Sequence, residues 1–314
     1  MTNESKKRYI AFSEQTPLPL FFRPFWLDMV SKEWNAVCVE KDGNLQAVWP
    51  YTIEKKIGVS LIRNPLLTPY LGPLFFLPKN LSEKKKEQQE EKLVATLLAQ
   101  LPEWDFLQVQ TVPDFPHFIV FHQHGIAHTQ RITYYVDVTG EENDIWKNIA
   151  SKQRYAIRQA ERELTITPAY EAYEMFYLLH KHTLERKGEK YPYTQAFFKK
   201  LFTTAQKKNC AYTTKAVNTQ GETTAMLFAA YDAEKMYLLL TAKNPQTPHN
   251  GAVALLIWDA IKKAKELGLR IFDFEGSMDK GIEPFFRSFG GERKTYLQAT
   301  ANRSKLWKLK EWIR

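Results

Sequence analysis

Acidic and hydroxyl side chains gather where a predicted strand ends near the C-terminus. Residues 269–298 open as an apolar strand in which Asp273 and Glu275 alternate with apolar residues, and Gly276-Ser277 then breaks the strand. Ligands of open α/β sheets bind at strand ends, and paired carboxyls can move protons there. The alternative is that both acids face solvent on an edge strand, since charged residues are mostly exposed. Arg287 follows on a short predicted helix that Gly290-Gly291 ends.

A second group of polar residues is a basic helix predicted within residues 147–162. Arg154, Arg158 and Arg162 are four apart and share one face, and Lys152 adds a further charge. Guanidinium groups donate paired hydrogen bonds and stay charged, so such a face suits phosphate. A solvated surface helix is the alternative interpretation.

The segment 244–252 joins a predicted strand to a predicted helix at residues 252–267. Free amides at a helix N-terminus bind anions, which makes this loop, with Gln246, Asn250 and Gly251, a candidate anion site. A plain strand-to-helix connection is the alternative. The histidines of residues 117–128 have no nearby carboxylates in the sequence, so we expect no metal site.

Composition favours polyanionic partners. The chain has 314 residues, a formal net charge of +9 and 44% hydrophobic residues, which together indicate a folded protein of about two domains. Positive charge suits RNA, phosphorylated substrates or an anionic membrane surface. Cys38 and Cys210 are expected to be buried reduced thiols. With neither a bilayer-length apolar run nor a signal-like N-terminus, we expect a cytoplasmic protein.

The order of predicted elements indicates an α/β (α+β) fold with mixed sheets flanked by helices. A hairpin at residues 34–54 and a helix at 82–100 belong to a first domain, residues 1–140. A long helix at residues 141–164 opens a second domain, residues 141–314, that repeats the same plan. The basic C-terminal segment 302–314 either packs on its own domain or lies on a membrane surface.

These segments resemble the FemABX peptidyltransferase family of the GNAT acyltransferase superfamily. The similarity is carried by IASKQRYAIRQAER, by NGAVALLIWDAIKKAKELGLRIFDFEGS, by GIEPFFRSFGGE and by WPYTIEKK with PLLTPYLGPLFF, and it covers nearly the whole chain. The resemblance implies two tandem GNAT-like domains. It also implies transfer of an acyl group, often aminoacyl from charged tRNA, onto an amine of a phosphorylated cell-envelope precursor at the inner face of the membrane.

The same resemblance implies roles for individual residues. Arg287 would stabilise the oxyanion but could not act as a base, because its pKa is too high. Asp273 or Glu275 would deprotonate or orient the amine. Lys152, Arg154, Arg158 and Ser277 would bind the substrate. No cofactor beyond the donor, aminoacyl-tRNA or acyl-CoA, is expected.

Two departures from the family bear on the donor. The chain lacks the long helical hairpin that would dock tRNA. Gln246 and Gly251 match the GNAT pyrophosphate loop and, with Asn250, would bind the donor, but His249 stands where that loop has its first glycine. Two alternatives follow: an acyl-CoA-dependent N-acyltransferase acting on an amino sugar or lipid-linked saccharide, or a non-catalytic protein that binds RNA or membranes.

Overall fold

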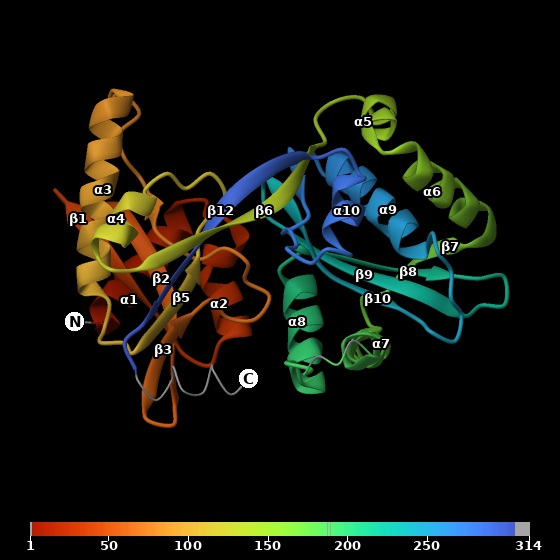
Figure 1. Ribbon diagram of the computed structural model, residues 1–314, viewed down its shortest axis with the longest axis horizontal. Coiled ribbons are helices and arrows are strands. Elements are labelled where there is room, and N and C mark those ends of the chain that lie inside the picture. The colour runs from red at the N-terminus through yellow and green to blue at the C-terminus, as the bar shows by residue number, and fades with distance from the viewer. Residues whose placement is uncertain (1, 187, 189, 305–314) are drawn as a thin grey trace. The chain divides into compact units, whose positions relative to one another are not determined.

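The computed structural model describes residues 2–186, 188 and 190–304, and they form two compact units (Figure 1). The first unit contains the described residues up to Arg131 and those from Thr295 onwards, and the second is Ile132–Lys294. The domain boundary predicted at residues 140 and 141 differs from this division. One cut falls inside a strand between residues 131 and 132 and the other inside a strand between residues 294 and 295, so the segment from Thr295 belongs to the first unit.

The first unit is a sheet with helices packed on it, in the strand order β1-β2-β3-β5-β12, with β4 paired to β2. The predicted hairpin is present, and its turn places Asp42 and Gly43 at φ of 52° and 77°. The N-terminal helix α1 was not predicted. The elements are α1 (Thr2–Gln15), η1 (Leu20–Phe22), α2 (Pro24–Val30), β1 (Trp34–Lys41), β2 (Asn44–Lys56), β3 (Val59–Arg63), β4 (Leu74–Phe75), α3 (Glu83–Gln100), β5 (Phe106–Gln110), α4 (Phe118–Gln123) and β12 (Glu292–Asn302).

The second unit carries the candidate site on a mixed sheet in the order β6-β11-β10-β9-β8-β7. Parallel pairing joins β10 to β11, and the remaining neighbours are antiparallel. The elements are β6 (Ala127–Asp137), α5 (Glu142–Asn148), α6 (Ser151–Glu163), β7 (Thr165–Pro168), α7 (Tyr173–Arg186), α8 (Gln195–Lys207), β8 (Ala211–Val217), β9 (Thr223–Tyr231), β10 (Lys235–Lys243), α9 (Ala252–Glu266), β11 (Ile271–Asp273) and α10 (Glu283–Arg287).

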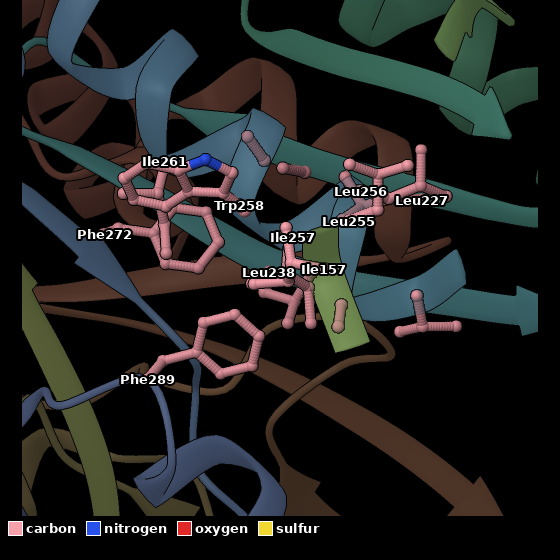
Figure 2. Close-up of a cluster of buried hydrophobic side chains, with 14 of the residues drawn as sticks. Ile157, Leu227, Leu238, Leu255, Leu256, Ile257, Trp258, Ile261, Phe272 and Phe289 are labelled. Atoms are coloured by element: carbon pink, nitrogen blue, oxygen red, sulfur yellow. The ribbon is translucent and has the colours of Figure 1, made fainter. Parts of the chain in front are cut away.

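Helices cover both faces of this sheet. Within the second unit, α6 and α9 lie on one face, and α7 and α8 on the other (Figure 1). The central helix α9 is apolar over most of its circumference, because it packs on strands and on α6 together. Figure 2 shows Trp258 and Ile261 of α9 in the cluster that also contains Phe272 of β11. This core fixes the position of β11, the strand that ends at Asp273.

The predicted single helix at residues 141–164 is wrong, because the chain forms two helices there. Ile149 and Ala150 are extended between α5 and α6, with ψ of 135° and 140°. The Ala150 N–H donates to the carbonyl of Ser288 at 2.8 Å, which fixes the break against the loop after α10. A long-range hydrogen bond therefore ends a helix that the local sequence would continue.

Candidate active site

The end of β11, which was predicted to be a ligand site, is buried. The parallel pairing between β10 and β11 covers Lys235–Tyr237 and Ile271–Asp273, whereas β10 runs on to Lys243. Asp273 is the last residue of β11 and has 0% of its surface exposed. The alternative that it faces solvent on an edge strand is therefore wrong, and a carboxyl lies inside the unit at the point where the two parallel strands stop pairing.

Asp273 organises the turn that follows it. Its Oδ1 accepts hydrogen bonds from Thr133 Oγ1 at 2.6 Å and from the backbone N–H of Glu275 at 2.8 Å. Glu275 and Gly276 then take φ of 56° and 77°. A Cβ on residue 276 would lie 1.8 Å from the carbonyl oxygen of Ile132, so only glycine fits there. A side-chain carboxylate that bonds the backbone two residues on is a common way to fix such a turn.

Glu275, the second acid of this site, has a pKa that its surroundings shift. Its Oε1 is buried and has no hydrogen-bond partner among the residues that the structure describes. Burial, reinforced by the negative charge of Asp273, raises the pKa of Glu275 well above its usual range. Burial also raises the pKa of Tyr193 to about 12, with a smaller contribution from the charge of Glu275. Strongly perturbed carboxyls of this kind are typical of functional sites.

Arg287 and Ser277 contact residues other than Asp273 and Glu275. Arg287 Nε is 3.6 Å from Glu283 Oε1, and 63% of its side chain is exposed. Glu283 also accepts a hydrogen bond from the hydroxyl of Tyr134. The Ser277 hydroxyl accepts from the Asp279 N–H at 3.1 Å. The structure thus brings Asp273 and Glu275 together. The guanidinium of Arg287 is exposed to solvent, and its role in stabilising the oxyanion stays a prediction.

The basic helix is only partly available to a ligand. Arg154 Nη1 donates to the carbonyls of Lys147 at 2.6 Å and of Ile149 at 2.8 Å, so it caps the end of α5. Arg158 lies over the ring of Trp146, 5.5 Å from its centre, and Lys152 is exposed. The regular spacing of the arginines therefore did not reveal that Arg154 caps a helix.

The loop before α9 is closed by a histidine. The Gly251 N–H donates to His249 Nδ1 at 3.1 Å, and His249 Nε2 lies 3.2 Å from Glu163 Oε2. The Gln246 N–H is bonded to Asn244 Oδ1 at 3.0 Å. The backbone N–H groups of residues 246 and 251, which were predicted to bind a donor phosphate, therefore already donate hydrogen bonds to side chains of the loop.

A cationic pocket lies beside this loop. Its volume is about 100 Å³. Arg186 and His182 line it from α7 and Lys243 from the end of β10, and the remaining lining residues are Thr183, Thr224, Asn244, Pro245, Pro248, His249 and Asn250. Of the three predicted donor-binding residues, Asn250 lines the pocket. Sequence reasoning missed Arg186 and Lys243, because the end of a helix and the end of a distant strand meet only in the fold.

The described histidines give no sign of a metal centre. His117 Nε2 is 2.7 Å from Glu90 Oε2 in the buried core of the first unit. Among the described residues, no three His, Cys, Asp or Glu side chains converge as ligands would. Within the same residues, no helix combines the length and apolar character needed to cross a bilayer. The basic segment 302–314, predicted either to pack on its own domain or to lie on a membrane surface, is mostly outside the described part of the chain.

Comparison with known proteins identifies the class of fold. Residues 145–287 match the family model described as "Acetyltransferase (GNAT) domain". The structure of FemX superposes with a TM-score of 0.66 at 12% identity, covering 98% of both chains. A tandem GNAT protein from the clavulanic acid biosynthesis pathway superposes with a TM-score of 0.51 at 11% identity, covering 96% of both chains. The predicted fold class and the FemABX-like resemblance are confirmed.

A third match is a C-terminal domain described as that of a lysylphosphatidylglycerol synthetase from Agrobacterium fabrum, with a TM-score of 0.57 at 11% identity. It covers 99% of this chain and 95% of that one. Comparison with curated protein sequences gives no significant match. The chain is thus a GNAT-fold protein similar to FemX. At these identities the likeness extends to the fold, and function must be argued from the site.

Proposed function

We propose that this protein is an acyltransferase of FemABX type that forms an amide on an amine of a phosphorylated cell-envelope precursor. The observation that carries the proposal is the carboxyl pair at the end of β11, in which Asp273 is buried and the pKa of Glu275 is raised by the burial of its carboxyl and by Asp273. The fold similarity to FemX, and to the domain described as a lysylphosphatidylglycerol synthetase, supports an acceptor of the cell envelope. The positive net charge supports a phosphorylated one.

Glu275 is suited to carry the proton of this reaction. The amine nitrogen attacks the acyl carbonyl, a C–N bond forms, and the ammonium proton passes to the Glu275 carboxylate. When the tetrahedral intermediate collapses, the bond from carbon to the leaving oxygen or sulfur breaks and Glu275 returns the proton to that atom. A carboxyl whose pKa is raised by burial and by Asp273 holds a proton between two such steps. Asp273 acts by positioning the Glu275 backbone.

The closed loop before α9 favours aminoacyl-tRNA over acyl-CoA as the donor. A pyrophosphate bound there would have to displace the His249 ring from the Gly251 N–H. It would also approach Glu163, a carboxylate of like charge. An aminoacyl ester at the end of tRNA does not need a pyrophosphate at this position.

The test compares Glu275→Gln with the unaltered protein in transfer of a labelled amino acid from charged tRNA to a muropeptide precursor. We expect the variant to lose about 100- to 10,000-fold in rate, because an amide cannot accept the proton. Glu266→Gln, an exposed acid paired with Lys263, is the matched control and should keep the full rate. An unchanged rate in Glu275→Gln would remove its role. Transfer from acetyl-CoA alone would establish the alternative donor, and no transfer from either donor would overturn the proposal.

A further inference from the structure

One face of α7 joins exposed apolar side chains to the cationic pocket. Met175, Leu178, His182 and Arg186 are spaced by three, four and four residues, which places them along a single helical stripe. Met175 is 42% and Leu178 62% exposed. His182 and Arg186 at the other end of the stripe line the pocket. The stripe therefore runs from a hydrocarbon surface into a positively charged hollow.

The positive charge of the pocket is not balanced by neighbouring acids. Within the described residues, neither Arg186 nor Lys243 forms an ion pair or hydrogen bond, and no Asp or Glu is among the lining residues. Glu163 contacts His249, and Glu185, on the same helix, lies 3.7 Å from Lys181. Cations that converge on one hollow without counter-charges create a site for an anion.

The apolar residues of the stripe, Met175 and Leu178, are not needed to pack α7 onto the unit. The opposite side of α7 already buries Phe176 and His180 against α8, so the helix is anchored without Met175 and Leu178. α7 lies on the sheet face opposite α9 (Figure 1). With a volume of about 100 Å³, the pocket can hold a compact anionic head, and an attached chain would have to continue outside it.

We infer that the α7 stripe and the cationic pocket together bind an anionic phospholipid at a membrane surface, with the phosphate in the pocket and hydrocarbon against Leu178 and Met175. Aliphatic side chains beside a phosphate site favour lipid over single-stranded nucleic acid, whose bases stack on aromatic rings. This inference concerns binding and stands whether or not the chain transfers acyl groups.

The test is sedimentation of the full chain with vesicles of phosphatidylcholine alone or mixed with phosphatidylglycerol. We expect binding to the mixed vesicles, reduced about 30-fold in Arg186→Ala/Lys243→Ala, since each cation near an anionic surface contributes about fivefold. Arg270→Ala/Lys207→Ala removes the same charge from exposed positions elsewhere in the unit and should cost less than about threefold. Equal losses in the two double variants would mean diffuse attraction and would overturn the site.

A second pair of variants tests the hydrocarbon contact. Leu178→Ser should weaken binding to mixed vesicles about tenfold, because less apolar surface enters the membrane interface. Leu267→Ser, at an apolar position 40% exposed at the end of α9, should leave binding unchanged. Normal vesicle binding by Leu178→Ser, with displacement by millimolar inorganic phosphate, would reveal a free-phosphate site and overturn the lipid assignment. Binding of single-stranded RNA but not vesicles, lost in Arg186→Ala/Lys243→Ala, would overturn it too.

Discussion

Gly276 sets the geometry of the candidate active site, and its replacement by alanine tests that geometry directly. The added Cβ would lie 1.8 Å from the carbonyl oxygen of Ile132, 2.7 Å from its carbonyl carbon and 3.0 Å from the Cα of Thr133. All three atoms belong to the backbone of β6, so no side chain can rotate away to make room. The strand must shift, or the turn that carries Glu275 must.

The expected cost has two parts. Residue 276 has φ of 77°, and alanine in a left-handed conformation costs about 1–2 kcal/mol. Overpacking against a fixed backbone adds roughly 1–3 kcal/mol. Gly276→Ala should therefore lower the free energy of unfolding by about 2–5 kcal/mol. Gly221→Ala isolates the first part, because Gly221 has φ of 81° and a Cβ there would meet nothing within 4 Å.

The assay is urea unfolding of the two variants and the unaltered protein at pH 7. Amide hydrogen exchange at Phe274, whose N–H bonds the Tyr134 carbonyl at 3.1 Å, adds a local reading. Gly276→Ala should unfold at lower urea than Gly221→Ala and should exchange faster at Phe274. If the two variants were equally destabilised, the contact with Ile132 would not constrain the turn, and the positioning of Glu275 argued from it would be refuted.

Two further predictions concern residues whose environments are equally specific. Burial lowers the pKa of His180 to about 4, below the value near 6.5 of the unfolded chain. The contribution of neutral His180 to the free energy of unfolding is therefore fully present above pH 6.5. It is lost as the pH falls from there to about 4, by roughly 3 kcal/mol in total. His180→Phe should flatten this dependence in pH-resolved urea unfolding, and an NMR titration of His180 centred near pH 6.5 would contradict the argument. Arg154→Ala should cost about 1.5–3 kcal/mol, because it leaves the carbonyls of Lys147 and Ile149 without a charged donor. Exposed Arg162→Ala should cost less than about 0.5 kcal/mol, and equal thermal shifts for the two would refute the capping role.

Local patterns were enough to place several elements and the strand end. The hairpin turn, the apolar run of α9 and the glycine after Glu275 each act through near neighbours in sequence, so they can be recognised without a structure. The direction of Asp273 could not be predicted in this way. Strict alternation describes a buried and an exposed acid equally well, and Thr133, which bonds Asp273, lies 140 residues away.

The structural role of Arg154 in the basic helix could not be predicted, for a related reason. Arginines four residues apart indicate a shared face, but the break between α5 and α6 turns Arg154 back onto the preceding helix. That break depends on the hydrogen bond from Ala150 to Ser288, which no local propensity encodes. The cationic pocket is likewise assembled from the ends of α7 and β10, so its charges are dispersed in the sequence and converge only in the fold.

The contacts of His249 support the proposed anion site beside the loop over one at the loop's own amides. A peptide N–H can only donate, so the bond from Gly251 requires an unprotonated His249 Nδ1, which leaves the ring proton on Nε2 to be donated to Glu163. In this tautomer the imidazole occupies the amide where a phosphate would bind, and it brings a carboxylate with it. An anion approaching the loop is therefore repelled from the Gly251 side and attracted to Arg186 and Lys243, where no described acid opposes it.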